Sequence, residues 1–398
     1  MRKLAEWMAA LLLWAALVPC AAAESKRYET SFLDVFDTFS QVVVYADTQE
    51  AAQEILQTVH DELKVYHRLF DIYQAYEGVN NLYTVNQNAG IAPVAVEQPL
   101  YDLLTFGKEI YAQTGGKTNI ALGSVLSIWH EYRELGLADP EHAAVPSAEE
   151  LYRAGEHTDI DQMLLDPEKR TVYLTDPEMS LDVGAIAKGC AVELTARKME
   201  AQGVDSLLMS IGGNLRSIGR KGDGTPWRAG VQNPDLSAKQ QNLAVIDLTD
   251  ASLVTSGSYQ RYYTVDGQQY HHIIDPETLY PAEHHWAVSV WTADSGLADA
   301  LSTALFVMSL DEGKALVEGW PGVEALWVQK DGALEYSSGW PDRARRTKNI
   351  QKTAPALPGR FAVMIKISLC SRRSTVRSSG NRHRWRRLRR SRKGRYLR

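Results

Sequence analysis

Apolar residues recur along the chain with the periods of both helices and strands. Ile55, Val59 and Leu63 lie on one face of a helix predicted between residues 50 and 66. Short runs rich in branched and aromatic residues are typical of strands. Such patterns predict strands at residues 36–46, 206–211, 227–231, 244–248, 253–254 and 286–291, helices at residues 100–114 and 297–310, a short helix after Ser147, and a glycine-bearing turn that leads into a helix between residues 182 and 203.

A hairpin is predicted around Asp266-Gly267, which separates the strand-forming runs at residues 262–265 and 268–274. Asp-Gly between two such runs is typical of a two-residue turn. The predicted helices and strands do not alternate regularly, as they would in a doubly wound parallel fold. We therefore predict a mixed α+β fold with antiparallel or mixed sheets and packed helices, and we find no internal repeat.

The N-terminus has the pattern of an export signal. Arg2 and Lys3 precede an apolar run at residues 7–18, which is short for a membrane span. Three alanines ending at Ala23 form a cleavage site, and the stretch ending at Cys20 resembles a bacterial lipobox. We expect residues 1–23 to be a signal peptide. The protein is then exported, either as a lipoprotein anchored to the membrane at Cys20 on the outer face of the cytoplasmic membrane or as a periplasmic or extracellular protein.

Charge is distributed unevenly along the chain. The net charge is -6, but residues 361–398 hold 14 Lys and Arg and no acidic residue, so the rest of the chain is strongly acidic. An acidic body is a poor binder of nucleic acid, and we expect no such partner. For residues 343–398 the alternatives are a disordered basic tail, a segment attracted to anionic lipid, and a frameshift artefact. We expect disorder or an artefact, with the catalytic domain at residues 28–342.

Candidate chemistry lies in two segments near the predicted hairpin and the helix that follows it. His272 offers an imidazole that can act as a base. Asp299 and Thr303 are four residues apart, so a carboxylate and a hydroxyl share one helix face. Mg²⁺ prefers such oxygen ligands, and attack on a pyrophosphate needs a metal and a base. The alternatives are a structural strand histidine for His272 and a helix N-terminal acid for Asp299.

Five motifs occur in one order over the second half of the chain. They are Leu181–Gly189 (LDVGAIAKG), Ser210–Gly219 (SIGGNLRSIG), Val254–Tyr259 (VTSGSY), His272–Thr278 (HIIDPET) and Ala298–Leu305 (ADALSTAL). In these motifs, and over roughly residues 30–340, the chain resembles the ApbE family of FAD:protein FMN transferases.

The resemblance implies an ApbE-like fold and a Mg²⁺-dependent reaction. Family members take FAD and pass its FMN moiety through a phosphoester to a Thr or Ser of an exported partner protein, which carries a D-x-x-[ST]-G-A-[ST]-like motif, and AMP leaves. Some relatives hydrolyse FAD to FMN and AMP. Two alternatives therefore stay open beside the transferase: an FAD pyrophosphatase and a lipoprotein that binds FAD without turnover.

The resemblance also implies roles for individual residues. His272 is the catalytic residue, and the metal is held by Asp299, Thr303 and the backbone carbonyl of Ala187. The alternative for Lys188 is a solvent-exposed lysine on a helix. The alternative for Gly212 and Gly213 is a turn without a binding role. The positions that match FAD-binding regions are Tyr73, Asn80, Asn119, Asp182, Lys188, Gly212, Gly213, Ser256, Gly257, Tyr259 and His272.

The chain departs from the family pattern at three places. Leu279 stands where a glycine is usual, so we expect that this position cannot easily adopt a positive φ and that the loop differs. Asn119 replaces an acidic residue and makes that wall of the pocket less negative. Residues 36–38 replace the usual Met-Gly-Thr at the first strand.

Overall fold

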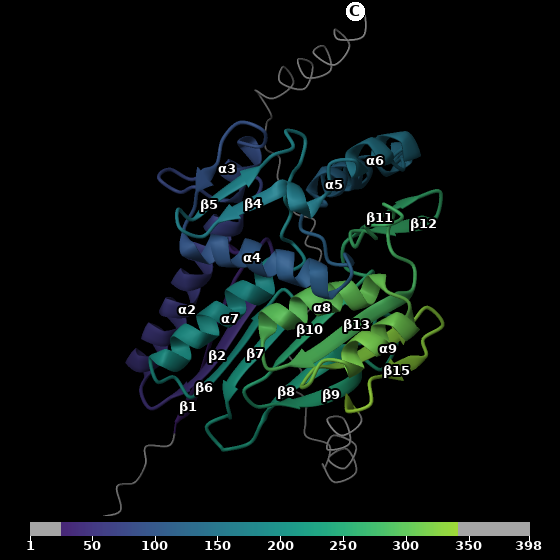
Figure 1. The fold of residues 1–398 in the computed structure, drawn as a ribbon. Coiled ribbons are helices and arrows are strands. Elements are labelled where there is room, and N and C mark those ends of the chain that lie inside the picture. The colour runs from purple at the N-terminus through teal and green to yellow at the C-terminus, as the bar shows by residue number, and fades with distance from the viewer. Residues whose placement is uncertain (1–24, 341–398) are drawn as a thin grey trace, which may run out of the picture. The chain divides into compact units, whose positions relative to one another are not determined.

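The computed structural model describes residues 25–340, which are drawn in colour in Figure 1. The predicted signal peptide at residues 1–23, with Cys20, and the predicted tail at residues 343–398 lie outside the described residues. Within the described part of the chain, no helix combines the length and the apolarity needed to cross a lipid bilayer.

Helices and strands follow one another in blocks. The helices are α2 (Gln49–Phe70), α3 (Leu82–Gln87), α4 (Gln98–Gln113), α5 (Gly123–Ala138), α6 (Ala148–Gly155), α7 (Ala187–Ala201), α8 (Ser295–Val307) and α9 (Leu310–Glu318), with short 3₁₀ turns at Pro140–His142 and Ile160–Gln162. The strands are β1 (Lys26–Phe32), β2 (Ser40–Ala46), β3 (Val94–Ala95), β4 (Met163–Asp166), β5 (Thr171–Leu174), β6 (Ser206–Ile211), β7 (Asn214–Gly219), β8 (Trp227–Gln232), β9 (Asn242–Leu248), β10 (Ser252–Gly257), β11 (Tyr262–Val265), β12 (Gln268–His271), β13 (His285–Thr292), β14 (Glu324–Gln329) and β15 (Leu334–Tyr336).

The centre of the fold is one sheet in which every strand pairs antiparallel with its neighbours. The strand order is β1-β2-β6-β7-β10-β13-β14-β15. The pairs β8–β9 and β11–β12 and the strands β3, β5 and β4 form separate small sheets. Helices pack on an antiparallel sheet instead of crossing between parallel strands, so the prediction of a mixed α+β fold is confirmed.

Alternate side chains of the central strands enter two different cores. On β2, Val42 and Val44 pack with α2 and α7, whereas Val43 packs with the β8–β9 hairpin on the other face. On β14, Trp327 packs with α8 and Leu326 packs with the hairpin. Figure 1 shows α7 and α8 lying across one face of the sheet. Because both faces are covered, these strands are apolar on both sides, which is why they appear in the sequence as continuous apolar runs.

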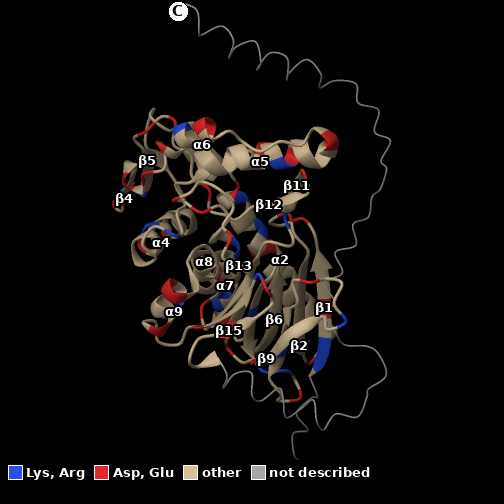
Figure 2. Ribbon diagram, turned by 90° about the vertical axis from the view of Figure 1, so that its right-hand side faces the viewer, with Lys and Arg blue, Asp and Glu red and all other residues tan. Residues whose placement is uncertain are grey.

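Several local predictions are confirmed. Ser147 accepts a hydrogen bond of 3.2 Å from the backbone N–H of Glu150 at the start of α6. Asp266 and Gly267 have φ values of 50° and 82°, as a two-residue hairpin turn requires. A capping box that was not predicted forms at the start of α9 between Ser309 and Glu312, and Figure 2 shows acidic residues on this helix.

The predicted start of the first strand is wrong. Strand β2 begins at Ser40, because Phe36 and Asp37 adopt left-handed φ values of 52° and 47° that cannot continue a strand. The backbone N–H of Phe36 donates instead to Nδ1 of His67 at 3.2 Å. Strand β12 likewise ends at His271, earlier than the predicted end at residue 274.

Helices α7 and α8 touch where Gly189 has no side chain. A Cβ on Gly189 would lie 2.3 Å from the backbone oxygen of Ser295 and 2.5 Å from Cβ of Asp299. Further along the contact, Arg197 of α7 pairs with Asp294, which caps α8. The two helices therefore run in opposite directions along their shared contact, and their first turns overlap.

We predict that Gly189→Ala destabilises the protein by about 2 kcal/mol, because the added methyl group overlaps backbone atoms that cannot rotate away. The free energy of unfolding, measured by urea denaturation, checks this. Gly319→Ala is the matched control: its φ is -81° and the nearest atom to a new Cβ is 3.4 Å away. That change should stay within about 0.5 kcal/mol of the unmodified protein. Equal losses in the two variants would contradict the close contact.

Candidate active site

The site is built around the carboxylate of Asp299 in α8. Its Oδ2 accepts a hydrogen bond of 2.8 Å from the backbone N–H of Gly189, in the first turn of α7. Nζ of Lys188 lies 3.6 Å from the same oxygen and donates to the carbonyl of Gly184 at 3.2 Å. Only 4% of Asp299 is exposed. A buried carboxylate is therefore held at the positive end of the α7 dipole.

Burial raises the pKa of Asp299, because a charged carboxylate loses its hydration there. Lys188, the N–H of Gly189 and the side chain of Asn214 lower it, but less than burial raises it. A cation beside Asp299 would favour the charged form, so the electrostatics of the position suit a bound cation.

Asn214 is a site residue that the sequence reasoning missed. It is 1% exposed, its side chain lowers the pKa of Asp299, and its Oδ1 has no hydrogen-bond partner among the described residues. Gly212 and Gly213, with φ values of 53° and 93°, form the tight turn that leads into it from β6 to β7. The signal in the sequence was its position directly after the glycine pair of the second motif.

The donors around Asp299 suit a hard cation. Thr303 follows one turn later in α8, so the two side chains lie on the same helix face. Ala187 opens α7 and is buried. Residues 25–340 contain no cluster of three or more His, Cys, Asp or Glu side chains able to hold a metal. A metal here would depend on one carboxylate plus hydroxyl, carbonyl and amide oxygens, a set that fits Mg²⁺ with waters or phosphate oxygens as further ligands.

The ring of His272 is oriented by the backbone of Arg261. Its Nδ1 lies 3.2 Å from the carbonyl oxygen of Arg261, and the backbone N–H of His272 donates to the same oxygen at 3.2 Å. A carbonyl only accepts, so Nδ1 carries the proton and Nε2 keeps a lone pair. Desolvation and the nearby charges of Arg261 and Lys188 lower the pKa of His272. The ring is therefore neutral near pH 7 and able to accept a proton.

His271, by contrast, is a structural histidine. Its Nε2 donates to the carbonyl oxygen of Ala282 at 2.8 Å, and its Nδ1 accepts from the backbone N–H of Ile273 at 3.2 Å. Both ring nitrogens are used within the loop, and burial lowers the pKa of His271 to about 4.

Asp182 stands at the end of a loop that runs into α7. Its Oδ1 accepts a hydrogen bond of 2.8 Å from the backbone N–H of Gly184. Burial raises the pKa of Asp182, while Gly184, His130 and Lys188 oppose the shift. Asp182 and His272 thus both interact electrostatically with Lys188. The structure places these three predicted residues in one region with Asp299.

The loop before Asp182 is held by an asparagine that sequence reasoning did not select. The side chain of Asn86 accepts from the backbone N–H of Leu181 at 2.8 Å and donates to its carbonyl at 2.9 Å. Tyr73 is 62% exposed, and its ring centre lies 5.5 Å from that of His130. His130 of α5 was also not selected, because nothing in its local sequence marks it.

Two predicted FAD-binding asparagines bond to backbone groups. Asn80 donates to the carbonyl of Ala95 at 2.8 Å. Asn119 donates to the carbonyl of Thr158 at 3.0 Å and accepts from the backbone N–H of Ala121 at 2.9 Å. Both side chains organise neighbouring loops in this structure.

The segment around Ser256 packs strand β10 against α8. The hydroxyl groups of Ser256 and Ser302 lie 2.8 Å apart. A Cβ on Gly257 would lie 2.4 Å from the ring of Tyr259, so the glycine allows that ring to fold over the backbone. Burial raises the pKa of Tyr259 to about 12, and the phenol is neutral.

Leu279 adopts the conformation that we expected it to avoid. Its φ is 62°, so the prediction of a different backbone at this position is wrong. The side chain is 7% exposed and packs against Gly155, and its carbonyl accepts from Nε1 of Trp129 at 2.8 Å. Burial of leucine offsets the strain of the left-handed backbone.

Comparison with known proteins identifies the family. The sequence model of the ApbE family matches residues 36–327. The chain belongs to the ApbE family, and the predicted ApbE-like fold is confirmed.

Relatives cover most of the chain. A protein of Treponema pallidum named FAD:protein FMN transferase is 34% identical over 337 residues, which are 81% of this chain and 90% of the relative. One of the same name from Escherichia coli K12 is 28% identical over 298 residues, 74% of this chain and 82% of the relative. The crystal structure of an ApbE protein from Thermotoga maritima has a TM-score of 0.70 at 29% identity and covers 80% of this chain and 100% of its own. The apo flavinyl transferase ApbE of Pseudomonas stutzeri has a TM-score of 0.67 at 26% identity, with 80% and 97% covered.

We predict that the protein loses stability as the pH falls from 6.5 towards 4. The folded pKa of His271 is about 4, below its ordinary value of 6.5, so the unfolded chain takes up this proton first. This histidine alone contributes a loss of about 3 kcal/mol across that window.

The measurement is urea denaturation at about pH 7 and about pH 4.5 for the natural protein and His271→Gln. The variant should be less stable near pH 7, because a bridge between two backbone groups is altered, and it should depend less on pH. An unchanged difference between the two pH values would contradict the role of His271.

Proposed function

We propose that this protein is a Mg²⁺-dependent FAD:protein FMN transferase. It attaches FMN from FAD through a phosphoester to a Thr or Ser of an exported redox protein and releases AMP. The observation that carries the proposal is the buried carboxylate of Asp299, held at the N-terminus of α7 with Lys188 beside it. The relatives that bear this activity in their names support it.

The start of α7 is suited to the pyrophosphate of FAD. A helix N-terminus presents backbone N–H groups and a partial positive charge to anions. Lys188 adds a full charge at the same place. Asp299, Thr303 and the carbonyl of Ala187 would hold Mg²⁺, which when bound would neutralise charge on the phosphate oxygens.

His272 is the proposed base. Its Nε2 takes the proton of the acceptor hydroxyl, whose oxygen forms a bond to the phosphorus of the FMN half of FAD. The bond from that phosphorus to the bridging oxygen breaks, and AMP leaves with that oxygen. The hydrogen bond from Nδ1 to the carbonyl of Arg261 holds the ring in the tautomer that this step requires.

The proposed partners are exported flavoproteins that carry a D-x-x-[ST]-G-A-[ST]-like motif. The signal pattern at residues 1–23 supports export, with attachment to the membrane by a lipid at Cys20 or release after cleavage. The excess of acidic residues before the basic tail supports the absence of a nucleic-acid partner.

The test measures the intact mass of an acceptor protein by mass spectrometry after incubation with the purified protein, FAD and Mg²⁺. We expect a mass gain equal to FMN less water that disappears with EDTA. Asp299→Ala should lower the rate of transfer by more than about 100-fold, since metal-assisted charge stabilisation is worth several kcal/mol.

Asp294→Asn, at the N-cap of the same helix, is the matched control. Asp294 caps α8 by accepting from the backbone N–H of Leu297 at 2.8 Å and pairs with Arg197 at 2.7 Å. Asparagine also caps helices well, so transfer should persist. Free FMN and AMP with an unmodified acceptor would make the protein an FAD pyrophosphatase. FAD that is bound but unchanged would make it a storage protein.

A further inference from the structure

A second carboxylate lies one turn from the site and has the same relation to its neighbours as Asp299. Glu193 of α7 is 6% exposed, and its Oε2 accepts a hydrogen bond of 3.0 Å from the backbone N–H of Ser295, the first residue of α8. Asp299 of α8 accepts from Gly189 at the start of α7. Each helix therefore supplies a carboxylate that caps the N-terminus of the other.

The two caps are linked by the spacing of the elements that bear them. Gly189 and Glu193 are one turn apart on α7, and Ser295 and Asp299 are one turn apart on α8. Strand β7 adds a third element beneath both caps. It contributes Asn214 to Asp299 and, two residues later on the same face of the strand, Arg216 to Glu193.

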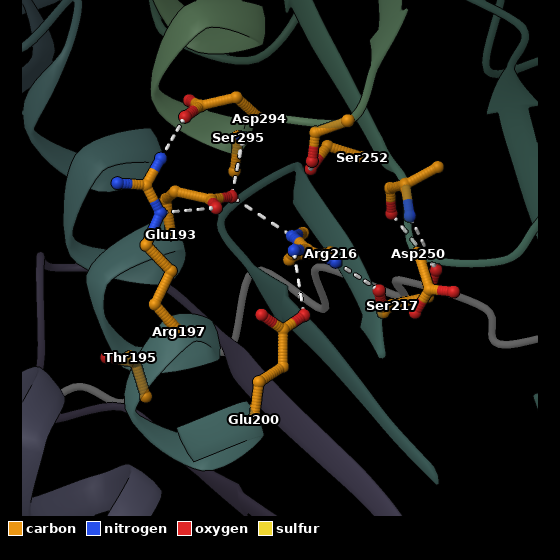
Figure 3. A network of polar contacts seen from close by, with 12 residues as sticks. Glu193, Thr195, Arg197, Glu200, Arg216, Ser217, Asp250, Ser252, Asp294 and Ser295 are labelled. Atoms are coloured by element: carbon orange, nitrogen blue, oxygen red, sulfur yellow. Dashed lines mark hydrogen bonds and ion pairs between the residues drawn. The ribbon is translucent and has the colours of Figure 1, made fainter. Parts of the chain in front are cut away.

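The two carboxylates differ in how completely they are neutralised. Figure 3 shows Glu193 between two guanidinium groups: Nε of Arg216 and Nε of Arg197 each lie 3.0 Å from one of its oxygens. Arg216 is 5% exposed and always charged, and it also binds Glu200 at 3.0 Å. The side-chain partners of the Asp299 carboxylate are weaker: the neutral amide of Asn214, and Nζ of Lys188 at 3.6 Å. Glu193 is saturated by the protein, whereas Asp299 keeps capacity for a cation.

We infer that Glu193 is a positioning residue for the cation site. It fixes where the start of α8 lies against α7, and this sets the distance of Asp299 and Thr303 from the first turn of α7. The inference rests on the proposed function, since it assumes that Asp299 holds the metal. Glu193 would act through its bond to the start of α8 and is not itself a proposed ligand.

Glu200 is the matched control for this inference. It binds the same guanidinium of Arg216 but has no bond to α8 in the described residues, and its side chain is 37% exposed. Glu193→Gln and Glu200→Gln each remove one negative charge from the network. Only the first weakens the cap that joins the two helices.

The experiment measures binding of Mn²⁺, as a probe for Mg²⁺, by electron paramagnetic resonance in the absence of FAD. We expect Glu193→Gln to weaken Mn²⁺ binding about tenfold or more, which is the usual effect of substituting residues that position metal ligands. Glu200→Gln should change the affinity for Mn²⁺ by less than about twofold. Thermal unfolding of each variant shows that it is folded. In the transfer assay, Glu193→Gln should need more Mg²⁺ for half-maximal rate and recover its rate at saturating Mg²⁺.

Ser295→Pro provides a second route if Glu193→Gln fails to fold. Proline is accepted at the first position of a helix, where it removes the N–H that donates to Glu193. The serine hydroxyl that is also lost has no hydrogen-bond partner in the described residues. It should weaken Mn²⁺ binding in the same way. Unchanged Mn²⁺ binding in folded Glu193→Gln, or equal losses in the Glu193 and Glu200 variants, would overturn the inference. Because Mn²⁺ binding is measured without flavin or acceptor, this result is separate from failure of FMN transfer.

Discussion

The fold depends most on the antiparallel contact between α7 and α8, in which each helix caps the other. The contact exists because Gly189 leaves space for the backbone of Ser295 and for Asp299. Both capping carboxylates are buried, and a buried charge must be paired with donors to persist. Helix N-terminal N–H groups supply those donors, so the pairing of the helices and the burial of the two acids require one another.

The chemistry follows from an asymmetry within this pair. Glu193 is enclosed by two arginines and is fully used in holding the helices together. Asp299 has the equivalent position with weaker partners, and burial raises the pKa of its carboxyl. A site that binds a cation needs such an incompletely neutralised carboxylate, held by surroundings that cannot relax around it. Glu193 therefore supplies the rigid part of the arrangement, and Asp299 supplies the carboxylate of the proposed cation site.

Sequence reasoning reached the parts of the site that depend on local periodicity. Asp299 and Thr303 share a helix face because they are four residues apart, and this is visible without a structure. Asn214 and Glu193 were not selected. Their importance depends on the pairing of β7 within the sheet and on the antiparallel crossing of two helices about a hundred residues apart in the chain. The motif order indicated the family, whereas only the fold shows which motif residues surround Asp299 and which hold loops.

The proposed base is positioned by a different kind of interaction from the carboxylate. His272 follows the β11–β12 hairpin, which packs on α5 through an apolar cluster that includes Trp129, Tyr263 and Leu279. The left-handed backbone conformation destabilises a leucine by about 1–2 kcal/mol, whereas full burial of its side chain stabilises the fold by about 1.5–3 kcal/mol. The loop therefore keeps a positive φ with leucine in place of the usual glycine, and the apolar side chain that causes the strain also anchors the loop. Asp299 is held by a hydrogen bond at the start of α7, whereas the hairpin that precedes His272 is held by apolar packing. The two halves of the site therefore have separate structural causes.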